Sequence, residues 1–175
     1  MAQSRTRLAI WLVLAGLALG SAVAAAAVYD SKRKHVEVAF LAYLGDLKTL
    51  RFQSASLRML PADLAALKQA ALDRASEYPE FRDAAMRFLG AADPADLAAE
   101  RKERFFEFLL DRTFGLHPEI HAALSQGSVI GMRIRRDGRK AHVDATLDLP
   151  GPGKARHFVM QVDLVELDDE WLVRL

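Results

Sequence analysis

The chain has 175 residues, with 24 Lys and Arg against 23 Asp and Glu, and it has no Cys. This length suits one domain with an appendage, and the lack of Cys excludes disulfide frameworks, thiol nucleophiles, thiolate zinc sites and iron–sulfur clusters. A formal net charge of +1 gives no general attraction to nucleic acid, and a hydrophobic content of 51% is too high for a disordered chain.

The first part of the chain contains an uncharged run over residues 8–29, LAIWLVLAGLALGSAVAAAAVY. As a helix this run is about 33 Å long, which is enough to cross a bilayer core of about 30 Å. The region also resembles a secretory signal peptide, because Arg5 and Arg7 precede the run and the Ala-Val-Ala sequence at residues 22–24 fits a cleavage site. The basic cluster at residues 32–34 opposes translocation and favours an uncleaved anchor. Both interpretations stay open.

These features divide the chain into three parts. We expect a transmembrane anchor or signal peptide over residues 1–29, a basic juxtamembrane linker over residues 30–35 and one folded domain over residues 36–175. Either form of the N-terminal segment places the domain outside the cytoplasm, unless the basic cluster at residues 32–34 reverses the topology. The expected location is the bacterial inner membrane with the domain facing the periplasm, or the periplasm itself if the segment is cleaved.

Helical signals fill the first part of the domain. Pro61 opens one helix, Gly90 closes another, and Asp93-Pro94 combines an N-cap with a proline in the first turn. Together with apolar residues at helical spacing, these signals predict helices over residues 36–59, 61–78, 80–89 and 94–113, with further turns over residues 118–125.

After Gly127 the apolar residues alternate with polar ones, which indicates strands. Asp137-Gly138 is a two-residue hairpin signal. A hairpin closed by Arg136 and Arg139 pairs Ile134 with Ala141, Met132 with Val143, and Ile130 with Ala145. Two more strands are expected over residues 155–167 and 171–175. The sequence therefore predicts an α+β domain with about four helices packed on a four-stranded antiparallel sheet.

The predicted hairpin carries a basic patch on its outward face. The patch consists of Arg133, Arg135, Lys140 and His142, and the expected register places Arg135 opposite Lys140 and Arg133 opposite His142. Such a patch could meet anionic lipid headgroups or an acidic partner, or it could be a solvated face. Nucleic acid is not an expected partner, because no aromatic residues interleave with the basic ones.

Other polar groups do not form a recognisable reactive site. His117 and His121 have the spacing of a metal-binding pair, but no third ligand follows at a recognisable spacing. His142, Asp144 and His157 could supply an acid–base pair, yet they lie on a face expected to be wet. We therefore expect no catalytic residue, no metal and no cofactor.

Residues 78–114 resemble the middle of the toluene-tolerance (MlaC) family of periplasmic phospholipid-binding proteins. The family carries a helix started by proline that ends in a pattern of the type F-x-x-L-L-x-x-(T/S)-(Y/F). Pro94 fits the start of that helix, and the end of the pattern is matched by Phe106, Leu109, Leu110, Thr113 and Phe114. The last strand of the family also carries a Trp, as Trp171 does here.

The resemblance implies a cone related to the nuclear transport factor 2-like fold, which holds phospholipid acyl chains between helices and sheet. It also implies an apolar pocket lined by Phe105, Phe108, Leu109, Met132, Val143, Phe158 and Met160. The first hypothesis is a non-catalytic envelope protein that binds phospholipid or another apolar ligand and takes part in lipid transport. The alternative is a membrane-tethered nuclear transport factor 2-like module that has a filled core and assembles with protein partners.

Overall fold

A computed structural model describes residues 31–149 and 156–175. The expected anchor or signal peptide over residues 1–29 and the Gly-Pro-Gly loop after the second strand lie outside these residues. The chain divides into two compact units, Met1–His35 and Val36–Leu175. Within the described ranges, no helix has both the length and the apolar character needed to span a bilayer.

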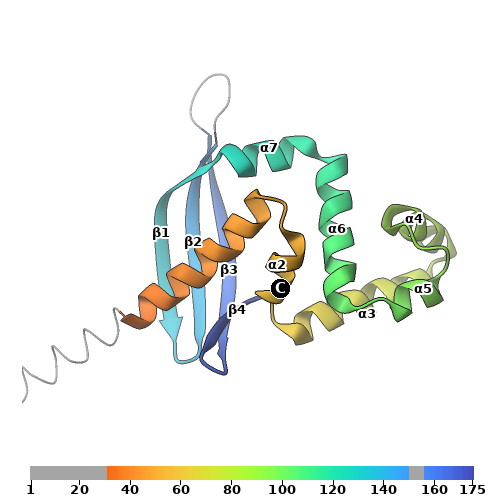
Figure 1. The fold of residues 1–175 in the computed structure, drawn as a ribbon, viewed down its shortest axis with the longest axis horizontal. Coiled ribbons are helices and arrows are strands. Elements are labelled where there is room, and N and C mark those ends of the chain that lie inside the picture. The colour runs from red at the N-terminus through yellow and green to blue at the C-terminus, as the bar shows by residue number, and fades with distance from the viewer. Residues whose placement is uncertain (1–30, 150–155) are drawn as a thin grey trace, which may run out of the picture. The chain divides into compact units, whose positions relative to one another are not determined.

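The unit Val36–Leu175 is an α+β domain, which confirms the predicted class (Figure 1). Residues 31–48 are helical, and the helices that follow are α2 (Phe52–Leu57), α3 (Pro61–Glu77), α4 (Pro79–Leu89), α5 (Pro94–Ala99), α6 (Lys102–Leu116) and α7 (Pro118–Gln126). The strands are β1 (Ser128–Asp137), β2 (Lys140–Leu149), β3 (Arg156–Leu167) and β4 (Glu170–Arg174). They form one antiparallel sheet in the order β1-β2-β3-β4.

The predicted helix ends at Gly90 and Asp93 are confirmed. Gly90 takes a left-handed conformation with φ of 71° at the C-terminus of α4, which is the conformation that glycine adopts most readily. The Asp93 side chain accepts hydrogen bonds from the backbone N–H groups of Ala95 and Asp96 at the start of α5. These two residues therefore close one helix and open the next through local interactions.

The single helix expected over residues 36–59 is wrong, because the chain turns at Leu50. Leu50 has a left-handed φ of 57°, and α2 begins only after it. The turn is held by buried Asp46, whose backbone carbonyl accepts from Arg51 N–H at 2.8 Å and whose carboxylate binds Arg51 and Arg58. A buried carboxylate needs such partners, and they are within its reach only if the helix stops before Arg51.

The single helix expected over residues 94–113 is also wrong. Glu100 and Arg101 are extended, so the segment is two helices, α5 and α6. Lys68 of α3 donates to the carbonyl oxygens of Ala98 and Glu100. A lysine that satisfies carbonyl groups at a helix end stabilises the break, and this contact from α3 has no signal in the local sequence.

The predicted register of the first hairpin is shifted by two residues. The loop is Gly138-Arg139, with Gly138 at a φ of 56°, and Asp137 pairs with Lys140. A shift of two residues keeps every side chain on its expected face. Ile134 is therefore opposite Val143 and Met132 is opposite Ala145.

Ile130 is the exception to the predicted alternation. The ladder pairs Val129 with Leu147 and then Gly131 with Thr146, so Ile130 is the extra residue of a β-bulge. Its side chain is 55% exposed. The predicted pairing of Ile130 with Ala145 is therefore wrong.

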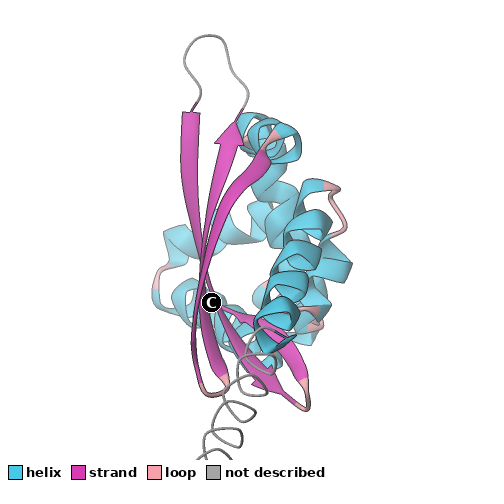
Figure 2. Cartoon of the chain, turned by 90° about the vertical axis from the view of Figure 1, so that its left-hand side faces the viewer, coloured by secondary structure: helices cyan, strands magenta, loops and turns pink. Residues whose placement is uncertain are grey.

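One face of the sheet, which we call the inner face, is covered by helices (Figure 2). Its central residues are Ala141, Val143, Ala145 and Leu147 on β2. They form a core cluster with Phe40, Leu44 and other buried side chains of the helix over residues 36–48. A second cluster, with Ala75, Met86, Leu89, Leu97 and Phe105, lies among the helices. The opposite, outer face carries the alternate strand residues.

The short strand β4 lies between β3 and the connection from α2 to α3. On one side it pairs with residues 163–167 of β3. On the other side Val173 N–H donates to the carbonyl of Arg58, and Leu60 N–H donates to the carbonyl of Val173, both at 2.8 Å. Asp63 of α3 also accepts from the backbone N–H of Leu175. Backbone bonds therefore join β4 to β3 on one edge and to the connection between α2 and α3 on the other.

Candidate functional site

All four residues of the predicted basic patch lie on the outer face. The observed register changes their neighbours, because Arg135 is opposite His142 and Arg133 is opposite Asp144. The predicted pairs of Arg135 with Lys140 and of Arg133 with His142 are therefore wrong. An acidic residue now lies within the patch, so the like-charge repulsion expected across the hairpin is reduced.

His142 lies at the centre of a polar network on the outer face. Its Nδ1 is 2.6 Å from Oδ1 of Asp163 on β3, and its Nε2 is 3.1 Å from Oδ1 of Asp144 on its own strand. Asp144 also accepts from Arg135 Nη2 at 3.1 Å and from Gln161 Nε2 at 2.9 Å. Three strands therefore contribute to one chain of charged hydrogen bonds.

This network shifts the pKa values of two of its members. The hydrogen bond to Asp163 is the main cause that raises the pKa of His142 above its usual value, and Asp144 adds to the effect. The pKa of Asp144 is lowered, chiefly by the hydrogen bond from Gln161 and also by His142 and Arg135. The imidazolium form of His142 can donate from both ring nitrogens, which matches two carboxylate acceptors.

We expect NMR to show that His142 titrates above pH 6.5, its usual value. Replacing Asp163 by asparagine should lower this pKa, because it removes the strongest acceptor. Asp148→Asn is the matched control, since Asp148 lies beside His157 on the same sheet and should leave His142 unchanged. A His142 titration at or below pH 6.5 in the original chain would contradict the network.

The same shift sets the direction of a pH effect on stability. A pKa that is raised in the folded chain contributes stability that is complete below about pH 6.5 and is lost as pH rises through the raised value. The free energy of unfolding should therefore fall across this range, and the fall should be smaller in Asp163→Asn.

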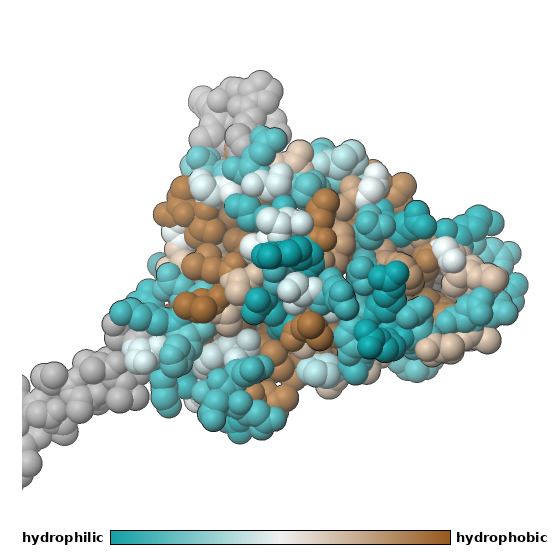
Figure 3. All heavy atoms as spheres, in the orientation of Figure 1, coloured by the Kyte–Doolittle hydropathy of each residue, from teal (hydrophilic) through white to brown (hydrophobic). Residues whose placement is uncertain are grey.

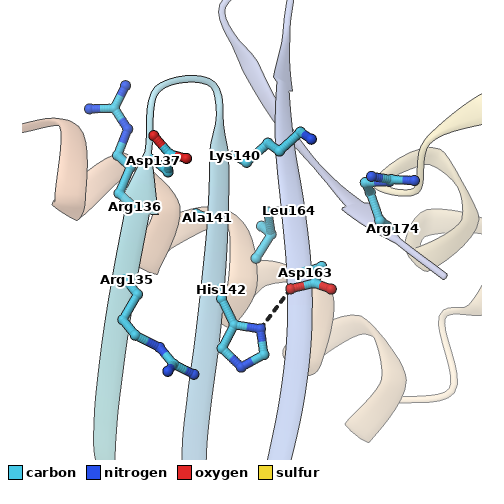
Figure 4. Close-up of a pocket in the computed structure, with 9 residues that line it drawn as sticks. All are labelled: Arg135, Arg136, Asp137, Lys140, Ala141, His142, Asp163, Leu164 and Arg174. Atoms are coloured by element: carbon cyan, nitrogen blue, oxygen red, sulfur yellow. Dashed lines mark hydrogen bonds and ion pairs between the residues drawn. The ribbon is translucent and has the colours of Figure 1, made fainter.

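A hollow of about 420 Å³ lies on the outer face, beside this network (Figure 4). We call it the outer-face hollow and define it by Arg135, Lys140, His142, Asp163 and Arg174, which come from all four strands. Arg136 and Asp137 also line the hollow, so its lining holds five basic and two acidic side chains. The hollow therefore extends the predicted patch across β3 to β4.

Arg174 was not among the expected patch residues. A signal for it exists in the alternation of β4, because Trp171 and Val173 are buried and Arg174, which follows them at an outward position, is exposed. Its neighbour across the sheet is Asp163. Alternation alone does not place Arg174 beside the hairpin, because that placement also depends on the order of the strands and on the register between β3 and β4.

The seven residues of the predicted apolar pocket are not brought together. Phe105, Phe108 and Leu109 belong to the second cluster among the helices. Val143 is fully buried in the first cluster, with Met132 and Met160 partly buried against it. Phe158 is on the inner face but is 53% exposed.

The two histidines with the spacing of a metal-binding pair contact separate partners. His117 Nδ1 is 3.2 Å from the Glu119 carboxylate, and His121 Nε2 is 3.3 Å from the carbonyl of Lys48. His121 and His117 therefore have different partners. Over residues 31–149 and 156–175, no group of three or more potential ligands has the arrangement of a metal site.

No protein-family model, curated protein or solved structure matches this chain.

Proposed function

We propose that this chain is a non-catalytic, membrane-anchored module of the bacterial envelope, whose α+β domain has a filled core and assembles with a protein partner. The observation that carries the proposal is the packing against the inner face. Phe40 and Val143 are fully buried there, and Phe106 of α6 belongs to the same cluster. Side chains of the protein occupy the region where a cone-shaped carrier would hold acyl chains.

Exposed apolar side chains support the assembly part of the proposal. On the helix over residues 36–48, Val38 is 65% exposed and Leu41 is 39% exposed, and Ile130 adds an apolar side chain from the bulge of β1. Figure 3 shows apolar surface beside this helix, over β1. Contiguous apolar surface of this kind is typical of protein interaction sites. The uncharged run over residues 8–29 supports the anchor.

Phospholipid binding is the second candidate, and one observation favours it. A hollow of about 330 Å³ is lined by Leu89, Leu97 and Phe108 together with polar neighbours. The guanidinium of Arg104 lies 4.5 Å from the centre of the Phe108 ring. The apolar floor suits an acyl chain. The polar neighbours are the Asp96 and Glu100 carboxylates, so this observation favours the acyl chain and not an anionic headgroup. This hollow lies at the second cluster, away from the inner face of the sheet.

A photoreactive phospholipid distinguishes the two candidates. The full chain is produced in bacteria, purified in maltoside detergent, loaded with the lipid, irradiated and measured by intact and peptide mass spectrometry. If the core is filled and the chain is anchored, intact mass spectrometry should give a mass that includes residues 1–29. Peptide mass spectrometry should then find no lipid attached to peptides of β2. Stoichiometric labelling of β2 peptides, or a mass that lacks the anchor, would contradict the filled module.

The second candidate predicts labelling of peptides from residues 87–108. A Phe108→Arg variant should abolish that labelling, because it places a charge in the apolar floor. Phe158→Arg is the matched control, since Phe158 is an exposed aromatic residue far along the chain on β3. Equal labelling in both variants would exclude the hollow at Phe108 as the lipid site.

A further inference from the structure

Two cations approach each other over β3 at the outer-face hollow. The Lys140 side chain extends from β2 across β3 towards Arg174 of β4 (Figure 4). Among the described residues, no hydrogen bond or ion pair engages Lys140. Arg174 is paired with Asp63 through Nε, at a long distance of 3.6 Å from Oδ2. Both groups therefore have donors available to a ligand.

The other basic side chains that line the hollow already have acidic partners, although Nε of Arg136 is buried without a hydrogen bond among the described residues. Arg135 binds Asp144. Arg136, which also lines the hollow, is bound to Glu166 at 3.4 Å and lies 5.3 Å from the centre of the Trp171 ring. The uncommitted positive charge is therefore concentrated at Lys140 and Arg174.

The carboxylate between these two cations is Asp163. Asp163 is the Cα partner of His142 on one side and of Arg174 on the other. Its Oδ1 is held by His142 at 2.6 Å. When His142 is protonated, its charge offsets that of Asp163, so an incoming anion meets a surface whose net charge is positive.

We propose that the outer-face hollow binds a phosphate group, with Lys140 and Arg174 as the residues that contact it. A guanidinium offers paired N–H donors to phosphate oxygens, and an ammonium offers a compact charge from the other side. A volume of about 420 Å³ leaves room for the remainder of a small phosphorylated molecule or a lipid headgroup. The hollow lies on the outer face, so its occupancy does not depend on whether the inner core is filled.

The protonation of His142 couples this site to pH. The groups that face His142 are Asp144 on its own strand, Arg135 on β1, and Asp163 on β3, whose neighbour on β4 is Arg174. Loss of the proton from His142 leaves the negative charge of Asp163 uncompensated beside the phosphate. The phosphate itself gains negative charge as pH rises, so the effect of His142 is measured against Asp163→Asn. As pH rises through the raised pKa of His142, phosphate binding by the original chain should weaken relative to binding by Asp163→Asn.

The test uses the full chain in maltoside micelles, observed by ¹H–¹⁵N NMR. Inorganic phosphate and glycerol 3-phosphate form the soluble arm, and phosphatidic acid with two short acyl chains forms the lipid arm. We expect saturable shifts at the amides of Lys140, Asp163 and Arg174. Saturation by either soluble ligand assigns a soluble source, and saturation by phosphatidic acid alone assigns a lipid headgroup.

The variants Lys140→Gln and Arg174→Gln should each weaken binding at least tenfold. Arg133→Gln is the matched control, because Arg133 is an exposed cation of the same face that does not line the hollow, and its affinity should stay within twofold. The proposal would be overturned if the amide shifts do not saturate with ligand or if sodium chloride reproduces them. It would also be overturned if the shifts persist in both Lys140→Gln and Arg174→Gln. These outcomes leave lipid labelling of β2 unaffected, so a failure here is distinct from a failure of the proposed function.

Discussion

Replacing Phe40 by alanine is expected to destabilise the α+β domain by about 3–5 kcal/mol. Phe40 is fully buried in the cluster that joins the helix over residues 36–48 to β2. The substitution removes a large apolar side chain and leaves a cavity that the rigid sheet cannot close. Urea denaturation of the full chain in maltoside, followed by far-ultraviolet circular dichroism, measures the change in the free energy of unfolding.

Val38→Ala is the matched control on the same helix. Val38 is 65% exposed, and a surface truncation of this kind should change stability by less than about 0.5 kcal/mol. If Phe40→Ala cost less than about 1 kcal/mol, the region between helix and sheet would be loosely occupied. That result would favour a hollow domain over the filled module proposed above.

The second large effect is expected at the turn between the first helix and α2. Arg58→Ala should destabilise the domain by about 2–4 kcal/mol, because it leaves the carboxylate of Asp46 buried with one fewer cation. Asp46 is 2% exposed, and Arg58 Nε lies 2.7 Å from its Oδ2. Arg51 remains as a partner but is largely exposed, so it compensates only in part.

A double-mutant cycle isolates this effect. In an Asp46→Asn background no carboxylate is left without its partner, so Arg58→Ala should then cost less than about 1 kcal/mol. Arg82→Ala is the control for the loss of an exposed ion pair, with an expected change within about 0.5 kcal/mol. Equal costs of Arg58→Ala in both backgrounds would show that the Arg58 stem, and not its charge, stabilises the turn.

The sequence predicts the elements of this fold well where the signal is local. Asp93 and Gly90 bound their helices through contacts within three or four residues, and the alternation in β2 and β3 places Val143 and Leu164 in the core as expected. The helix break after Lys48 depends on the buried carboxylate of Asp46 and its ion pair with Arg58. The break after Ala99 depends on Lys68, which is distant in the chain. Lys68 lies 32 residues before the carbonyl of Glu100 to which it donates.

In the candidate site, too, local patterns predict some features and contacts distant in the chain determine the others. The outward positions of Arg133, Arg135, Lys140 and His142 follow from alternation alone, and the structure places all of them on one face. Their electrostatic partners do not follow, because moving the loop from Asp137-Gly138 to Gly138-Arg139 changes which charges face one another. The apolar pocket fails to assemble for a related reason: helical spacing indicates which face of α6 is buried, but Phe105 packs within the helical cluster and not against the sheet.

The position of β4 has a consequence for synthesis of the protein on the ribosome. The contacts of β4 with the early helices include a hydrogen bond from Leu175 to Asp63, which are 112 residues apart. At typical rates of 5–20 residues per second, translation takes ~6–22 s to supply that partner. During this interval the connection between α2 and α3 exposes the backbone groups that will later bind Val173. The connection between α2 and α3 therefore completes its backbone hydrogen bonds only after β4 has been synthesised.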